Sequence, residues 1–178
     1  MFGELYGSAA ESRFARDLPE VIAWLGGGPE PGTVVECNFV PNRILGLRTR
    51  NSAAYKGLHI LLMRQGPCDF RTGERISDAI YAEEKVDIHH IFPQDWCKKN
   101  NVGPDRCDNI VNKTPLSART NRTIGGNAPS TYLGRLESRF KASPEQMDGL
   151  LRSHLIDAGL LRSDDFTAFF AVGKEAVL

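Results

Sequence analysis

Residues 86–93 read Val86-Asp87-Ile88-His89-His90-Ile91-Phe92-Pro93, so two adjacent histidines lie in an apolar, β-rich run that a proline ends. Successive side chains of a regular strand point to opposite faces, so the two imidazoles would point apart. For both to act at one place, the backbone must turn at or just after the pair, and Pro93 is consistent with that turn. A packed histidine beside an unrelated solvated one would give the same short pattern. The residues downstream decide between these interpretations.

Two more elements follow the histidine pair. The residues from Asn109 to Thr114 predict a turn and a second short strand, and Ser117 to Ile124 predict a short helix closed by Gly125-Gly126. The order strand, strand, helix predicts a compact β-β-α unit.

Such a unit could hold a metal beside a base. His89 could offer a ring nitrogen to the ion, and Asn121 could add a carbonyl oxygen from the helix. His90, whose ordinary pKa lies near neutral pH, could stay unbound and act as the base. One nitrogen, one oxygen and several waters suit a single Mg²⁺ or Mn²⁺ ion.

The motif of the HNH endonucleases (the ββα-metal or His-Me finger enzymes) is similar to three segments of the chain: His89-His90-Ile91-Phe92-Pro93, Asn112-Lys113-Thr114-Pro115-Leu116-Ser117 and Thr120-Asn121-Arg122. The variant resembles the C-terminal nuclease domain of GmrSD-type restriction enzymes, which the stretches Arg48 to Gly57 and Pro129 to Leu133 also resemble. It also resembles the C-terminal nicking domain of SspE-like, phosphorothioation-dependent phage-defence proteins. The resemblance covers roughly residues 45–140, and its pieces are specific in combination.

The resemblance implies a role for each matching residue. His89 and Asn121 match the two metal ligands, and His90 matches the general base. Asn112 matches the asparagine of the catalytic site that ties the loop together through its amide hydrogen bonds. Asn109 competes for that role, but the nine-residue step from Asn112 to Asn121 fits the family pattern better.

Other positions are implied less directly. Asp87 could orient a histidine from behind the metal, or it could be an ordinary surface acid of the strand. Arg119, Arg122 and Lys113 could hold phosphates, although solvated side chains would have the same pattern. Gly125 stands where some HNH enzymes carry a third ligand, a histidine, which favours the two-ligand Mg²⁺ site over a zinc site.

The remaining chain predicts helices around this unit. Apolar spacing from Ser8 to Leu25 predicts a helix that Pro19 breaks or restarts, and Gly26 to Gly32 is a loop by composition. Further helices are expected from Asn51 or Ser52 to about Arg64, from Ser130 to Phe140, from Ser143 or Pro144 to near Gly159, and from Asp164 onward. Ile76 to Tyr81 is expected to be a short helix or strand.

The predicted fold class is α+β and mostly helical, with a ββα-metal core wrapped by N- and C-terminal helices. Residues 1–32 are expected to form an N-terminal helical appendage or linker, and residues 33–178 the nuclease domain. Within that domain the core lies at about 85–126 and the C-terminal helices at 129–178.

Charge is unevenly distributed on a chain whose formal net charge is zero. Residues 98–141 hold nine Lys or Arg against three acids, and residues 43–75 hold seven against two. Such asymmetry can give a basic surface for phosphates, or only ordinary solvated faces. The cysteines (Cys37, Cys68, Cys97 and Cys107) form no C-x-x-C pair, which argues against a zinc ribbon and a thioredoxin-like site. No apolar run is long enough to span a membrane, and no signal peptide is predicted.

The sequence therefore predicts a metal-dependent endonuclease that nicks double-stranded DNA, phage or foreign, in the bacterial cytoplasm. In the resembling family an N-terminal NTPase-like sensing domain is fused or partnered, so the chain is expected to be a C-terminal fragment with no membrane partner. Two alternatives stay open. One is a DNA-binding module that keeps the ββα shape without cutting, and the other is a structural zinc domain that uses His89, His90, Cys97 and Cys107.

Overall fold

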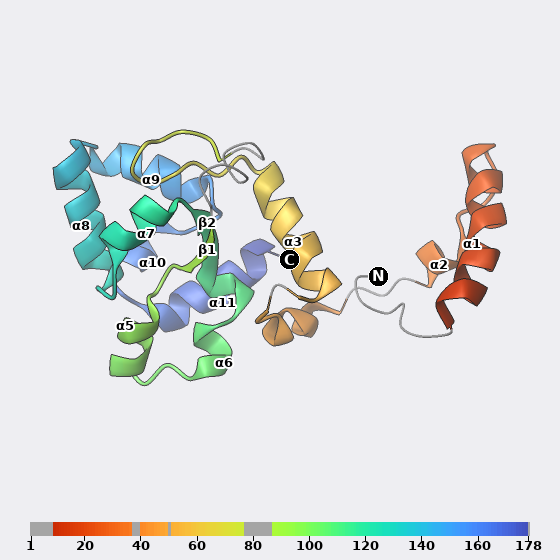
Figure 1. Cartoon of the computed structure of the whole chain (residues 1–178), viewed down its shortest axis with the longest axis horizontal. Helices are drawn as coiled ribbons and strands as arrows, with labels where there is room; N and C mark the ends of the chain where they lie inside the picture. Colours follow the sequence, from red (N-terminus) through yellow and green to blue (C-terminus); the bar gives the residue numbers. More distant parts are fainter. Residues whose placement is uncertain (1–8, 37–39, 50, 77–86, 178) are drawn as a thin grey trace.

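The computed structural model describes residues 9–36, 40–49, 51–76 and 87–177. These residues are mostly helical and include one two-stranded antiparallel sheet, which confirms the α+β class (Figure 1). Among them, no helix is both long and apolar enough to cross a lipid bilayer. In chain order the elements are α1 (Ala9–Leu25), α2 (Gly32–Val35), η1 (Pro41–Gly46), α3 (Ala53–Arg64), β1 (Asp87–His90), α5 (Gln94–Lys99), α6 (Pro104–Cys107), η2 (Ile110–Asn112), β2 (Lys113–Leu116), α7 (Ala118–Ile124), α8 (Pro129–Phe140), α9 (Pro144–Arg152), α10 (Ala158–Arg162) and α11 (Phe166–Val177).

The sheet pairs the strand that carries both histidines with the strand that follows the predicted turn. β1 runs antiparallel to β2, with Asp87 opposite Leu116 and His90 opposite Lys113. The pairing extends one step beyond β1, because the backbone N–H of Ile91 donates to the carbonyl of the residue before β2 at 2.9 Å.

α7 begins directly after β2, so the predicted order strand, strand, helix is confirmed. Its N-terminal cap is Ser117, whose hydroxyl accepts from the backbone N–H of Thr120 at 3.2 Å. The helix ends at Gly125, which has a φ of 57° in the left-handed region that glycine adopts without strain.

A buried carboxylate ties the turn after α3 to the start of α7. Asp69 Oδ1 accepts from the Thr120 hydroxyl at 2.7 Å and from the backbone N–H of Arg71 at 3.0 Å. Its Oδ2 accepts from the backbone N–H of Ser117 at 3.0 Å. Burial raises the pKa of Asp69, but these hydrogen bonds outweigh burial and bring the pKa below its ordinary value. The ionised side chain therefore anchors the helix that carries Asn121.

Aromatic packing fixes the place where β1 ends. Phe92 is fully buried, and its ring centroid lies 4.8 Å from Trp96 of α5, 5.2 Å from Phe166 and 5.0 Å from Phe169 of α11. From α8, the hydroxyl of Tyr132 donates to the carbonyl of Ile91 at 3.0 Å. Buried aromatic rings contribute strongly to a core, so α5, α8 and α11 together hold the segment that follows the histidines.

The C-terminal helices surround the sheet and α7, with one departure from the prediction. α8 contacts α7, α9 and α10, and α11 contacts α10 and η2. The helix predicted to run to near Gly159 ends at Arg152 as α9, and that prediction was wrong. The backbone turns at Leu155, which has a φ of 60°, and Asp157 then caps a separate helix by accepting from the N–H of Leu160 at 2.9 Å.

α3 agrees with its prediction at both ends. Ser52 caps it by accepting from the backbone N–H of Tyr55 at 3.2 Å, and the helix ends at Arg64. Tyr55 is buried on its inner face, whereas Leu61 is 48% exposed. The element expected at Ile76 to Tyr81 falls almost entirely outside the described residues.

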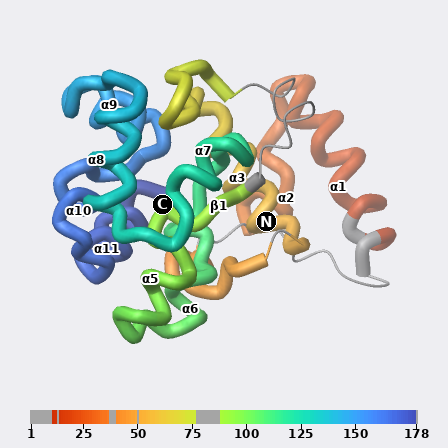
Figure 2. Tube along the Cα trace, turned by 60° about the vertical axis from the view of Figure 1, so that its left-hand side comes forward, coloured from red at the N-terminus to blue at the C-terminus, as the bar shows by residue number. Residues whose placement is uncertain are grey.

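α1 and α2 pack on each other (Figure 2), and Figure 1 shows that they lie apart from the remaining helices. α1 runs through Pro19 without a break, so the expected interruption was wrong; the proline is exposed, where a helix can bend to accommodate it. α2 joins α1 through the backbone N–H of Gly32, which donates to Glu20 at 2.6 Å, and through Arg16, which donates to the hydroxyl of Thr33 at 2.8 Å. Residues 32–35 thus belong with α1, whereas the predicted boundary follows residue 32.

Candidate functional site

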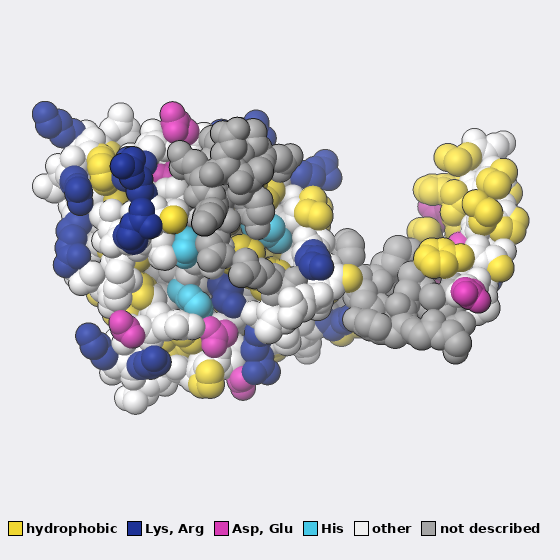
Figure 3. Space-filling model, viewed as in Figure 1, with side chains coloured by type: hydrophobic (Ala, Val, Ile, Leu, Met, Phe, Trp, Pro, Cys, Tyr) yellow, Lys and Arg dark blue, Asp and Glu magenta, His cyan; other side chains and the backbone are white. Residues whose placement is uncertain are grey.

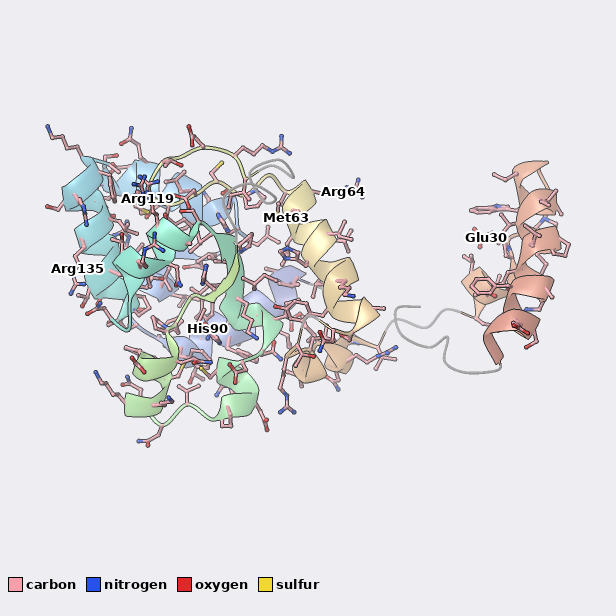
Figure 4. The ribbon with its side chains drawn as sticks, in the orientation of Figure 1. Glu30, Met63, Arg64, His90, Arg119 and Arg135 are labelled. Carbon is pink, nitrogen blue, oxygen red and sulfur yellow. The ribbon has the colours of Figure 1, made fainter. Side chains whose placement is uncertain are left out.

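A pocket of about 220 Å³ opens where β1 runs into α5. It brings together His89, His90 and Asn121, the residues that the sequence assigns to the metal and the base. The chain bends at residues 91 and 92, directly after β1, which is the turn expected if both histidines serve one place. Figure 4 shows His90 at this end of the sheet. The remaining lining residues are Pro93, Gln94, Asp95, Gly125 and Gly126.

His90 is held by a carboxylate that follows α6. Its Nε2 lies 2.9 Å from Oδ1 of Asp108, which also accepts from Nε2 of Gln94 at 3.1 Å. Burial raises the pKa of Asp108, but the hydrogen bonds from His90 and Gln94 outweigh it, and the pKa lies below its ordinary value. An ionised carboxylate only accepts hydrogen bonds, so the neutral His90 ring carries its proton on Nε2 and its lone pair on Nδ1.

The environment of His90 also favours the neutral ring. Burial is the largest influence and lowers the pKa of His90, the hydrogen bond to Asp108 raises it, and the positive charge of Lys113 lowers it. The net pKa lies below the ordinary value, so the ring is neutral at pH 7 and able to accept a proton. The side chain is still 20% exposed, which leaves it in contact with solvent.

The amide of Asn112 closes the loop beneath the histidines. The side chain is fully buried and accepts from the backbone N–H of Phe92 at 2.8 Å. It donates to the carbonyls of Phe92 at 3.0 Å and Cys107 at 2.9 Å. One side chain therefore joins the end of β1 to the end of α6, the two segments that supply His90 and its carboxylate partner.

Asn109 makes a different connection. Its amide donates to the carbonyls of Ile44 at 3.0 Å and Leu45 at 3.1 Å, and accepts from the backbone N–H of Val111 at 3.0 Å. It therefore fastens the loop to η1, whereas Asn112 fastens it to β1. The two asparagines that competed for one role in the sequence hold two different contacts.

Asn121 reaches the pocket from α7, whose end shapes the opposite wall. Gly125 lines this wall with a φ of 57°, where an L side chain would be strained. A Cβ on Gly126 would lie 2.7 Å from the carboxylate of Asp95. The wall therefore has little room for a ligand side chain at either glycine.

A second hollow, of about 390 Å³, shares His90 with the pocket and is lined by cationic and polar groups. Lys113, one of the predicted phosphate contacts, lies in it beside Arg48. The Lys113 ammonium donates to the carbonyl of Arg48 at 2.7 Å and lies 5.9 Å from the centroid of the Tyr55 ring. Arg48 itself pairs with Asp105. The other lining residues are Thr49, Asn51 and Ile88.

The remaining predicted residues lie outside these two hollows. Arg119 and Arg122 are exposed on α7 and line neither hollow, and Figure 4 shows Arg119 above the sheet. Figure 3 shows histidine side chains reaching the surface in the middle of this face, with Lys and Arg side chains around them. Asp87 pairs with Leu116 through the backbone, and its side chain lies outside the described residues.

Three acids of the site were not singled out in the sequence. Asp108 holds His90, Asp95 lines the pocket, and Asp69 anchors α7. Only Asp95 had a usable signal, because it lies two residues after Pro93, which ends the run that carries the histidines. Asp108 and Asp69 contact residues 18 and 51 positions away, which no local pattern reports.

The structure does not group the four residues of the alternative zinc site. Within the described residues, the His, Cys, Asp and Glu side chains whose ligand atoms gather are His90, Cys107 and Asp108, within 4.8 Å of one another. Cys97 is buried, and its thiol donates to the carbonyl of Phe92 at 3.5 Å. A different donor set therefore stands behind His90.

Comparisons with known proteins give one distant relative. No family profile and no solved structure matches the chain. It is 28% identical over 138 residues to an uncharacterized protein of Methanocaldococcus jannaschii, MJ0686. The match covers 75% of this chain and 23% of the archaeal protein, so the chain spans about a quarter of the length of that relative.

Proposed function

We propose that the chain is a metal-dependent endonuclease of the HNH type, which nicks double-stranded DNA as the effector of a restriction or phage-defence system. The observation that carries the proposal is the pocket that His89, His90 and Asn121 share, although they come from β1 and α7. The resemblance of their sequence motif to the HNH enzymes supports the same function.

The donor set of the pocket fits Mg²⁺ or Mn²⁺. His89 offers a ring nitrogen, Asn121 an amide oxygen, and Asp95 a carboxylate in the same lining. Mg²⁺ keeps several of its waters, so a site with only a few protein ligands suits it. The cavity of about 220 Å³ has room for such waters, each of which takes up roughly 30 Å³. When bound, the ion would polarise the phosphate and stabilise charge on the leaving oxygen.

His90 supplies the base. Its Nδ1 takes a proton from a water molecule while the oxygen of that water attacks phosphorus in line with the departing 3′-oxygen. The imidazolium that forms is stabilised by the carboxylate of Asp108, 2.9 Å from Nε2. Asn112 contributes by fixing the two backbone segments that carry this pair.

Phosphate contacts fit the basic groups around the pocket. Lys113 and Arg48 line the hollow beside His90, and Arg119 and Arg122 are exposed on α7. Such contacts position a duplex without reading its sequence. Choice of target and any NTP dependence would then come from an NTPase-like sensing domain, fused or separate. The proposed DNA cleavage would take place in the cytoplasm of a bacterium.

The decisive experiment is incubation of supercoiled plasmid with the purified chain and Mg²⁺ or Mn²⁺, beside an EDTA control and a His90→Ala variant. We expect open-circular product from the wild type alone, with the variant at least about 100-fold slower because a general base contributes 10²–10⁴-fold. Because one site cuts one strand per encounter, nicked plasmid should precede linear plasmid. Equal nicking by His90→Ala would refute the assignment of the base.

The nicking assay and a gel-shift assay together distinguish the enzyme from the second candidate function, a module that binds DNA without cutting. Binding in a gel-shift assay without metal-dependent nicking, repeated after addition of an NTPase-like partner domain, would favour that module. The intact histidine pair and its ionised partner Asp108 favour the enzyme.

A further inference from the structure

A second set of metal ligands stands on the side of His90 where Asp108 lies. A ring nitrogen of His90, the sulfur of Cys107 and a carboxylate oxygen of Asp108 all lie within 4.8 Å of one another, and Nε2 is the ring nitrogen that lies 2.9 Å from Asp108. We propose that these three atoms bind a thiophilic divalent cation such as Zn²⁺, at a site separate from the Mg²⁺ pocket, and that this cation switches off His90 as a base. The binding itself is independent of the proposed nuclease function, and only its effect on nicking rests on that function.

The spacing suits a small tetrahedral ion after modest adjustment. Zn–N bonds of about 2.0 Å and Zn–S bonds of about 2.3 Å place ligand atoms roughly 3.3–3.7 Å apart. Nε2 of His90 and Oδ1 of Asp108 are 2.9 Å apart, so they would open slightly while the sulfur closes in from at most 4.8 Å. The side chain of Asp108 is 39% exposed and has freedom to move.

The donor chemistry selects the class of metal. A thiolate and an imidazole favour Zn²⁺ and similar ions, whereas Mg²⁺ prefers oxygen ligands and keeps its waters. Cys107 would lose its proton to solvent when the ion binds. Cys97 lies beside Cys107, but its thiol donates to Phe92 and is not among the gathered ligand atoms, so we expect water to fill the fourth position from the exposed side of Asp108.

The effect on catalysis follows from the two ring nitrogens of His90. In the metal-free arrangement Nε2–H donates to Asp108, and Nδ1 keeps the lone pair that takes a proton from water. A cation on Nε2 needs the lone pair there, so the ring proton moves to Nδ1. The ring stays neutral, but its base position is now occupied by a proton, and the cation also repels a second one.

The site is tested by direct binding, in the absence of DNA. The full chain is purified without chelator, dialysed against Zn²⁺ and analysed for bound metal, and Co²⁺ is used as a spectroscopic probe for thiolate ligation. We expect one bound ion and a thiolate-to-cobalt charge-transfer band. Cys107→Ser and Asp108→Asn should each weaken binding by at least about tenfold, the loss seen when even an outer partner of a metal ligand is removed.

Cys68→Ser is the matched control, because Cys68 is a half-buried thiol in the turn after α3, where it donates to the carbonyl of Gly66 at 3.5 Å. It should bind Zn²⁺ like the wild type. Circular dichroism shows whether each variant is folded, and a folded Cys107→Ser with wild-type affinity or band would overturn the site. Absence of binding by the wild type would overturn it too.

A nicking assay then tests the consequence within each protein, as the ratio of rates in Mg²⁺ with and without Zn²⁺. We expect Zn²⁺ to inhibit the wild type and Cys68→Ser by at least about tenfold, since a general base contributes 10²–10⁴-fold, and to inhibit Cys107→Ser far less. Zn²⁺ bound through Cys107 without inhibition would overturn the switch. Zn²⁺ binding in a chain that never nicks DNA would instead contradict the nuclease proposal and leave the metal site standing.

Discussion

Nε2 of His90 and Oδ1 of Asp108 lie 2.9 Å apart, although 18 positions separate the two residues in the chain. A base that is itself oriented by a third group is the usual arrangement for proton abstraction in enzymes. The carboxylate sets which nitrogen carries the proton, and its charge would stabilise the imidazolium that forms in the proposed reaction. Asp108 is therefore a positioning residue for the proposed base.

The first prediction concerns Asp108→Asn. The amide keeps an oxygen for Nε2–H but loses the charge, so the imidazolium is less stable, and we expect kcat for nicking to fall at least about tenfold, part of the 10²–10⁴ that a general base contributes. KM and DNA affinity should stay within about twofold of wild type. Single-turnover nicking measures the rate of cleavage, and gel-shift titration measures DNA affinity. Glu175→Gln, which removes one charge from the exposed end of α11, is the control, and an equal loss in both variants would count against the role of Asp108.

The second prediction concerns the metal. Asn121→Ala removes one of the three donor side chains proposed for the pocket, so the Mg²⁺ concentration for half-maximal nicking should rise at least about tenfold. Asn100→Ala is the matched control, because this exposed asparagine caps α5 by donating to Trp96 at 2.9 Å. An unchanged Mg²⁺ titration for Asn121→Ala would rule out the residue as a ligand.

Local patterns were sufficient for the elements that carry the proposed ligands. The β-rich run around Ile88, the cap at Ser117 and the glycine at 125 each act through neighbouring residues, so β1 and α7 could be predicted from the sequence. The meeting of His89, His90 and Asn121 was expected from the family resemblance rather than from any pattern of spacing. Periodicity places residues on an element and does not determine which elements meet.

The contacts that orient the site were beyond local patterns. Asp69 and Asp108 look like ordinary turn acids, and only the packing of α7 and α6 brings them to their partners. At Pro19 and Leu155 the local rules themselves gave wrong predictions. The exposed helix α1 continues through Pro19, and the backbone turns at Leu155, which has a φ of 60°, where a continuous helix was predicted. Tertiary packing decided both places against the local rule.

The third prediction is that Asp69→Asn destabilises the fold. Both oxygens of this carboxylate accept hydrogen bonds from buried groups. The NH₂ group that replaces one oxygen in Asp69→Asn cannot accept, so a buried donor is left unpaired at a cost of about 1–3 kcal/mol. Because its pKa is lowered, Asp69 contributes its stability above the ordinary pKa of 3.8 and loses it as the pH falls through the lower folded value. Urea unfolding at pH 7 measures the difference. Asp157→Asn is the control, since asparagine caps a helix as well as aspartate does, and an equally stable Asp69→Asn would refute the anchor.

The fourth prediction concerns the hollow beside His90. If it tracks the DNA backbone, Arg48→Ala should weaken DNA binding and reduce the slope of log K against log salt concentration by about one. Arg64→Ala is the matched control, because Arg64 lines a different groove at the far end of α3 and points away from the sheet in Figure 4. Equal salt slopes for the wild type and Arg48→Ala would place the DNA elsewhere.

The fifth prediction concerns His154, a buried histidine just after α9. The residue is 8% exposed; its Nε2–H donates to the carbonyl of Cys68 at 2.8 Å, and its Nδ1 accepts from the hydroxyl of Thr114. Burial lowers the pKa of His154 to about 4, against 6.5 for the ordinary side chain. The ring is therefore neutral in the folded chain over a range of pH where the unfolded chain binds a proton.

The sign of the effect follows from linkage between protonation and folding. As the pH falls below 6.5, His154 in the unfolded chain binds a proton, whereas in the folded chain it stays neutral until the pH nears its pKa of about 4. Stability therefore declines across this window. The fall attributable to His154 is about 2 kcal/mol between pH 7 and pH 5. His154→Gln can donate and accept but does not titrate, so it should lose this part of the pH dependence while other histidines keep theirs. Urea unfolding at both pH values measures this dependence. The same change in unfolding free energy with pH for the wild type and His154→Gln would mean that His154 titrates as it does in water.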